Sequence, residues 1–72
     1  MDIEKQEILI RFGNNLRKLR LEKGFTQERL ANELGIEISQ VSRIERGVIN
    51  TSMTTIYSIS KILKVEISLL FK

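Results

Sequence analysis

Gly35 separates two short groups of apolar residues that repeat at helical spacing, and this arrangement constrains the fold more than any other feature. The residues before it are Leu30, Ala31 and Leu34, and those after it are Ile36, Val41 and Ile44. Such spacing predicts two amphipathic helices. The first begins at Thr26, whose hydroxyl can accept a hydrogen bond from a first-turn amide. Because glycine readily adopts the left-handed conformation that ends a helix, Gly35 predicts a tight corner. The second helix then begins near Glu37 or Ile38.

The second helix presents a polar outer face. The small side chain of Ala31 lets the two helices approach closely and cross steeply, while Val41 and Ile44 fill the angle between them. The residues left outside are Ile38 at the exposed start, then Ser39, Gln40, Ser42, Arg43 and Arg46. Hydroxyl, amide and guanidinium groups can bond to base edges in a DNA groove, and cations can contact phosphates. This face therefore predicts a base-reading helix.

The segment from Thr26 to Gly47 resembles the helix-turn-helix of the phage-repressor or Xre-like family of bacterial DNA-binding regulators. The matching positions are Gln27, Ala31, Gly35, Val41 and the IERG sequence of residues 44–47. The resemblance extends roughly from Phe12 to Leu70, and several matches at fixed spacing make it a specific signal. It implies an all-α, compact five-helix bundle of the lambda-repressor-like type. We expect one domain over residues 1–72, with the helix-turn-helix core at 26–47.

A long helix is predicted ahead of the motif, from about Glu4 to Lys23. Its apolar face consists of Ile8, Phe12, Leu16 and Leu19. Gly13 inside this helix indicates either close approach by a neighbouring helix or a bend, because a mid-helix glycine costs about 1 kcal/mol relative to alanine. Gly24 ends the helix, and Phe25 enters the core.

Two shorter helices are predicted after the motif. Thr51 or Ser52 caps a fourth helix that runs to about Leu63, and a fifth spans residues 67–71. The last segment holds three large apolar residues, Ile67, Leu70 and Phe71. They require cover, either from the chain's own core or from a second copy. The resemblance implies a two-fold dimer through these residues, with recognition helices ~34 Å apart on a palindromic site.

Composition excludes several classes of function. The 72 residues include no cysteine or histidine, the carboxylates are scattered, and there is no glycine-rich phosphate loop. We therefore expect no enzyme, no cofactor, no metal site and no small-molecule ligand. Without disulfides the domain suits the cytoplasm, and its apolar runs are far shorter than the ~20 residues of a membrane span. The net charge of +3 fits DNA binding but also fits an ordinary solvated surface, and the N-terminal Asp2, Glu4 and Glu7 form an acidic extension.

Contacts with double-stranded DNA can be assigned to single residues. The predicted base contacts are Ile38, Ser39, Gln40 and Arg43, and the predicted phosphate contacts are Thr26, Gln27, Arg46 and Asn50. Arg43 suits guanine and Ile38 suits a thymine methyl group. Gln27 lies at the amino end of a helix, where free amides and the dipole favour phosphate. Glu37 departs from the family pattern: it either caps its helix and accepts from a cytosine amine, or weakens binding.

Arg20 and Glu45 are predicted to form a structural ion pair. Glu45 lies in the last turn of its helix, where the helix dipole disfavours an anion and a nearby cation is expected. The resemblance implies that Arg20 is this partner. The pair would then hold the scaffold together rather than contact DNA.

Two functions from different classes follow. The first is a dimeric, sequence-specific regulator that acts by occupying promoter DNA, as a restriction-modification controller, a small phage-type repressor or an antitoxin-like autoregulator. The second is a protein-interaction module that keeps the helix-turn-helix scaffold but holds a partner with its apolar C-terminal end.

Overall fold

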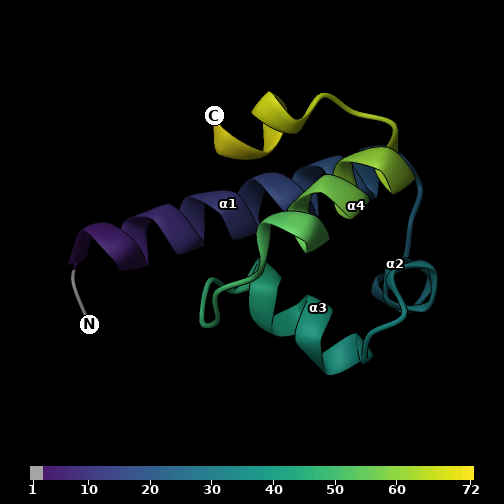
Figure 1. The fold of residues 1–72 in the computed structure, drawn as a ribbon, viewed down its shortest axis with the longest axis horizontal. Helices are drawn as coiled ribbons and strands as arrows, with labels where there is room; N and C mark the ends of the chain where they lie inside the picture. The colour runs from purple at the N-terminus through teal and green to yellow at the C-terminus, as the bar shows by residue number, and fades with distance from the viewer. Residues whose placement is uncertain (1–2) are drawn as a thin grey trace.

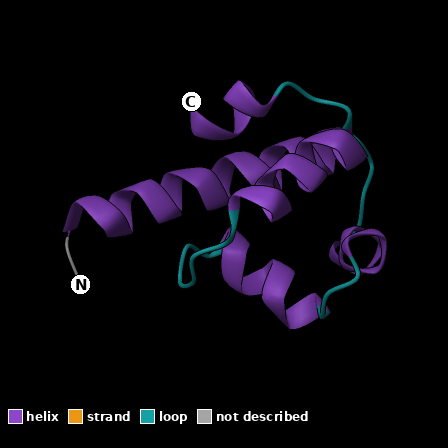
Figure 2. Cartoon of the chain, in the orientation of Figure 1, coloured by secondary structure: helices purple, strands orange, loops and turns teal. Residues whose placement is uncertain are grey.

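The computed structural model describes residues 3–72 and confirms the all-α class. Its elements are α1 (Ile3–Glu22), α2 (Gln27–Leu34), α3 (Ile38–Glu45), α4 (Met53–Leu63) and the 3-10 helix η1 (Ile67–Phe71). Loops join them without strands over the described range (Figure 2). The fifth expected helix is therefore a 3-10 segment rather than an α-helix. Asp2, which belongs to the predicted acidic N-terminal extension, lies outside the described residues.

The long helix α1 is the element around which the others are arranged. It packs against α3 and against η1, which lie on opposite sides of it in Figure 1. Its N-terminal turns project beyond the rest of the molecule (Figure 1). Ile8, at the N-terminal end of the apolar face predicted for this helix, is 60% exposed, because the apolar periodicity continues past the last helix able to cover it. Along residues 3–72, no helix combines the length and apolar character that crossing a bilayer requires.

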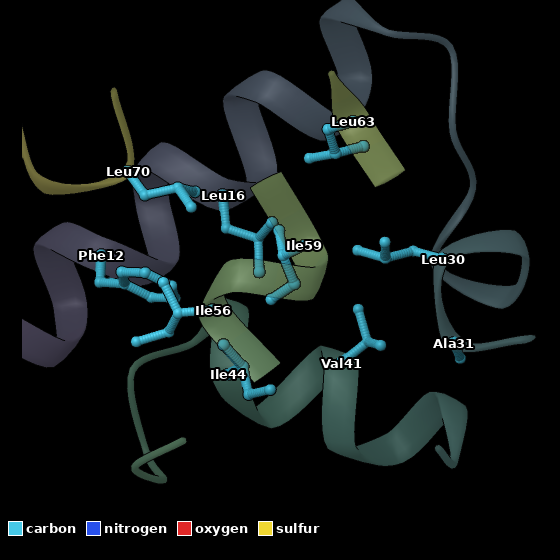
Figure 3. Close-up of a cluster of buried hydrophobic side chains, with 10 residues drawn as sticks. All are labelled: Phe12, Leu16, Leu30, Ala31, Val41, Ile44, Ile56, Ile59, Leu63 and Leu70. Carbon is cyan, nitrogen blue, oxygen red and sulfur yellow. The ribbon is translucent and has the colours of Figure 1, made fainter. Parts of the chain in front are cut away.

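The core draws side chains from every element (Figure 3). It consists of Phe12, Leu16, Leu30, Ala31, Val41, Ile44, Ile56, Ile59, Leu63 and Leu70. Leu70 is completely buried, and the Asn15 side-chain amide donates to its carbonyl at 3.1 Å. The C-terminal segment is thus fixed to α1 by both an apolar contact and a hydrogen bond.

Local capping explains most of the helix boundaries. The Thr26 hydroxyl accepts from the backbone N–H of Arg29 at 3.0 Å and starts α2. Gly35 ends α2 in the left-handed conformation, with φ of 73°. Ser52, rather than Thr51, caps α4 by accepting from the Thr55 N–H at 3.2 Å. At the end of α4, Lys64 takes the left-handed position with φ of 57°.

Gly13 marks a close crossing between α1 and the end of α3. A methyl group at this position would overlap the carbonyl oxygens of Ile44 and Glu45. Gly47 makes a second close approach, since a Cβ there would lie 2.7 Å from the Cα of Ile10. Of the two explanations for Gly13, the structure therefore supports close approach. The two glycines together let the C-terminal end of α3 lie directly on α1.

Candidate nucleic-acid interface

The corner between α2 and α3 is held from its buried side. Figure 1 views α2 nearly end-on while α3 runs across the view, so the two axes cross steeply. Ala31 and Val41 are 2% and 1% exposed at this junction, and Ile44 continues the buried side of α3 into the core. Since these contacts fix both the position and the rotation of α3, the opposite face of α3 is held towards solvent.

The outer face of α3 is exposed and basic. Ser39, Arg43 and Arg46 follow one another at helical spacing and are all exposed. Ile38, at the start of the helix, is 49% exposed. Within residues 3–72, neither the Arg43 nor the Arg46 guanidinium makes a hydrogen bond or ion pair. The arginines on this face are therefore available to a ligand.

Glu37 and Gln40 organise the start of α3. Glu37 is the N-cap residue, and its backbone N–H donates to Oε1 of Gln40 at 3.3 Å. The Gln40 side chain is exposed. Its oxygen accepts the hydrogen bond from the Glu37 backbone N–H, while its amide nitrogen stays available to donate. Glu37 thus occupies the N-cap position, where the Gln40 side chain rather than the Glu37 carboxylate makes the side-chain hydrogen bond, and the two alternatives for Glu37 on DNA stay open.

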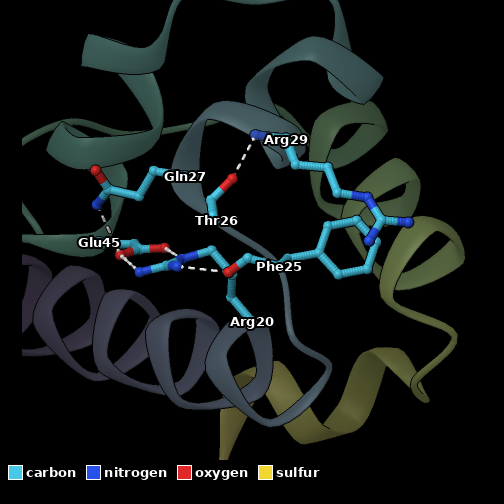
Figure 4. Close-up of polar contacts among 6 residues, drawn as sticks. All are labelled: Arg20, Phe25, Thr26, Gln27, Arg29 and Glu45. Carbon is cyan, nitrogen blue, oxygen red and sulfur yellow. Dashed lines mark hydrogen bonds and ion pairs between the residues drawn. The ribbon is translucent and has the colours of Figure 1, made fainter.

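A hydrogen-bonded network joins the three helices behind this face (Figure 4). Arg20 donates from Nε to Oε2 of Glu45 at 2.6 Å, and from Nη2 to Oε1 at 3.1 Å. Arg20 also donates to the Phe25 carbonyl at 2.8 Å, and Gln27 Nε2 donates to Glu45 Oε1 at 3.0 Å. The predicted Arg20–Glu45 pair is therefore present. The Gln27 side chain belongs to the same network, a role that its position in the sequence did not indicate.

The first turn of α2 carries two of the predicted phosphate contacts. Thr26 is exposed and its hydroxyl oxygen caps the helix, whereas the half-buried Gln27 points its amide at Glu45. Arg29 lies over the Phe25 ring, 4.0 Å from the centroid, and also pairs with Glu33 (Figure 4 shows the ring contact). The Thr26 hydroxyl satisfies the Arg29 amide, so the backbone amides of Gln27 and Glu28 remain as donors at this end of α2, where the helix dipole favours an anion.

A solvent-open hollow of about 390 Å³ lies where α1, α2 and α3 meet. It is lined by Asn14, Arg17, Gln27, Ser42, Glu45 and Arg46. Asn14 and Arg17 were not predicted to lie beside the helix-turn-helix. The one available signal was their spacing of three residues, which puts both on one face of α1. The outer face of α3 thus continues into a polar hollow bordered by α1.

The remaining predicted site residues lie apart from the outer face. Asn50 is exposed in the loop before α4, and its side-chain oxygen accepts from the Thr51 N–H at 3.2 Å. Of the expected dimer residues, Ile67 is half-buried and Phe71 is 49% exposed. Leu70 has no exposed surface, because it points between α1 and α4 into the chain's own core (Figure 3). The prediction that Leu70 lies in a dimer interface is therefore wrong.

Curated proteins of similar sequence share most of this chain's length. Control protein C.MunI from Mycoplasma sp is 41% identical over 66 residues, covering 90% of this chain and 89% of that protein. Control protein C.BamHI from Bacillus amyloliquefaciens is 42% identical over 60 residues, covering 82% of this chain and 74% of that protein.

A solved structure and a family pattern agree with these relatives. The restriction-modification controller protein C.AhdI from Aeromonas hydrophila superposes with a TM-score of 0.82 at 41% identity, covering 88% of this chain and 96% of that one. Residues 16–70 match the family described as helix-turn-helix. The chain belongs to the helix-turn-helix family of DNA-binding transcriptional regulators.

Proposed function

We propose that this protein is a sequence-specific regulator that binds palindromic promoter DNA as a homodimer, with α3 in the major groove. The observation that carries the proposal is the outer face of α3. Arg43 and Arg46 are exposed there without a partner in the described chain, while Val41 and Ile44 fix the opposite side in the core. A rigid helix with free, convergent donors is suited to read base edges.

Each exposed residue of α3 has a role in this proposal. Arg43 donates to a guanine, Ser39 and the Gln40 amide contact neighbouring base edges, and Ile38 packs against a thymine methyl group. Phosphates are contacted by the group predicted from the sequence: Thr26, Gln27, Arg46 and Asn50. For Gln27 the contact runs through the backbone amide at the start of α2, since its side-chain nitrogen already bonds to Glu45.

The dimer contact rests on the exposed part of the C-terminal segment. Phe71 is half exposed and its ring packs against Phe12, with centroids 5.4 Å apart. Together with Ile67 it offers an apolar surface beside α1. A two-fold contact there would place two α3 helices ~34 Å apart, the spacing of successive major grooves on one side of DNA.

The similarity to whole control proteins supports a narrower class. The matches to C.MunI and C.AhdI cover about nine tenths of each chain or more, so the similarity extends over nearly the full length of those control proteins. We infer a regulator of the restriction-modification controller type, acting in the cytoplasm by occupying the promoter of the genes that it controls.

Salt dependence tests this function against the protein-interaction alternative. A fluorescent duplex recovered by selection from random-sequence DNA is titrated with protein between 50 and 300 mM salt. Of the four phosphate contacts in each protomer only Arg46 is cationic, so in a dimer the logarithm of the association constant should fall against log salt with a slope of about −2 or steeper, because counter-ion release follows the phosphates neutralised by Lys and Arg. A flat response, or no binding of any selected duplex, contradicts the proposal and favours an apolar protein interface.

A further inference from the structure

We propose that the hollow between α1, α2 and α3 is an additional phosphate site, in which Arg17 and Asn14 of α1 hold the DNA backbone beside the groove occupied by α3. This inference rests on the proposed function. It adds a third helix to the interface and assigns binding roles to two residues that lie outside the helix-turn-helix.

The position of the hollow supports this role. Ser42 and Arg46 line it, and they share one face of α3 with Ser39 and Arg43. If Arg43 lies in the major groove of a duplex, one of the two sugar-phosphate backbones that border the groove must pass along the rest of that face. Asn14 and Arg17 lie on the same side of α3 as Ser42 and Arg46. A phosphate there would meet donors from α1 and α3 together.

The charge of the hollow favours an anion. Arg17 and Arg46 are exposed, and neither guanidinium forms a hydrogen bond or ion pair within the described part of the chain. Glu45 is the one carboxylate among the lining residues, but both its oxygens accept hydrogen bonds from Arg20, and one also accepts from Gln27. These hydrogen bonds compensate the negative charge of Glu45. The unpaired guanidinium groups of Arg17 and Arg46 therefore make the opening of the hollow positively charged.

The available donors match a phosphate better than a base edge. Arg17 presents a fork of N–H groups suited to two oxygens of one phosphate, and the exposed Asn14 adds an amide one helical turn away. Both stand on α1, which lies behind the recognition helix and cannot enter the groove with it. Contacts of this kind fix the register of the protein on DNA and carry no sequence information.

Paired charge-removing variants test the site. Arg17→Gln and Lys18→Gln each remove one exposed cation from neighbouring positions of α1, but Lys18 does not line the hollow. On the selected duplex, Arg17→Gln should weaken binding about tenfold at ~0.15 M salt and reduce the salt slope by about 1 for each protomer. Lys18→Gln should change affinity less than about twofold, since exposed charges further from the DNA are screened. Arg17→Lys should recover part of the loss. Sequence preference and melting temperature should match wild type in all three.

A methylphosphonate scan then locates the contact. One uncharged methylphosphonate is placed at each successive position of the selected duplex, and affinities of wild type and Arg17→Gln are compared. At one phosphate in each half-site, the substitution should weaken wild type but cost the variant nothing further. Equal effects of Arg17→Gln and Lys18→Gln, or additive losses at every phosphate, would overturn the site while leaving the regulator function intact. If wild type itself binds without salt dependence, the failure lies with the proposed function.

Discussion

Arg20 and Glu45 form a two-bond ion pair that joins the C-terminal part of α1 to the last turn of α3, through Nε–Oε2 at 2.6 Å and Nη2–Oε1 at 3.1 Å. The residues are 6% and 5% exposed, so water contributes little to either charge. Gln27 adds the start of α2 to the same carboxylate. This polar contact among three helices therefore helps to hold the last turn of α3 in place, together with the buried side chains of Val41 and Ile44.

Removing Glu45 should destabilise the fold strongly. In Glu45→Ala the Arg20 cation stays buried without its partner, and we expect the free energy of unfolding to fall by about 3 to 5 kcal/mol, measured by urea denaturation at fixed protein concentration. Glu33→Ala is the matched control, because it breaks the Arg29 pair, whose side chains are 58% and 42% exposed. That variant should lose less than about 1 kcal/mol. Equal losses in the two variants would show that the buried Arg20–Glu45 pair contributes no more to stability than the exposed Arg29–Glu33 pair.

Gly13→Ala should lower stability although alanine is the better helix former. On an open helix surface this change would gain about 1 kcal/mol. Here the added methyl group overlaps the Ile44 and Glu45 carbonyls, so the backbones of α1 and α3 must separate, at a cost of about 1 to 3 kcal/mol. Thermal denaturation measures the difference. Gln6→Ala, at an exposed position of the same helix, should stay within about 0.5 kcal/mol of wild type. A Gly13→Ala protein more stable than wild type would contradict the close crossing.

Leu70 and Phe71 should respond differently to truncation, although they are adjacent. Leu70→Ala removes a fully buried side chain and should reduce unfolding free energy by about 2 to 5 kcal/mol. Phe71→Ala removes a half-exposed ring at the proposed dimer contact, and should raise the dimer dissociation constant about tenfold. Analytical ultracentrifugation over a concentration series measures the second effect. An unchanged monomer–dimer equilibrium in Phe71→Ala would place the dimer contact elsewhere on the surface.

Local signals in the sequence predicted the helices and the corner well. Thr26 and Gly35 act on their own neighbouring amides and carbonyls, so their roles could be assigned without knowing the rest of the fold. The alternation of buried and exposed residues in α3 followed likewise from helical spacing around Val41 and Ile44. Lys64 is a departure, because a lysine gives no local hint of the left-handed conformation that it adopts.

Features that depend on distant parts of the chain could not be predicted in the same way. The role of Gly13 depends on where the end of α3 crosses α1, and the exposure of Ile8 depends on how far the neighbouring helices reach along α1. Leu70 and Phe71 have the same apolar character, and only the docking of η1 on α1 decides which of them enters the core. The hollow beside Arg17 is formed by three helices together, so it could not be predicted before their packing was known.

The most direct test of the recognition face is a selection from random-sequence DNA with wild type and Arg43→Ala in parallel. Arg46→Ala is the control, since it removes another exposed arginine of the same helix face, one proposed to contact phosphate. Wild type should recover a two-fold symmetric site, and Arg43→Ala should lose preference at one base pair in each half-site, equivalent to about 1 to 3 kcal/mol. Arg46→Ala should weaken all sequences alike. If Arg43→Ala selects the same site with undiminished preference at every position, the outer face of α3 does not read DNA through Arg43 and the account is contradicted.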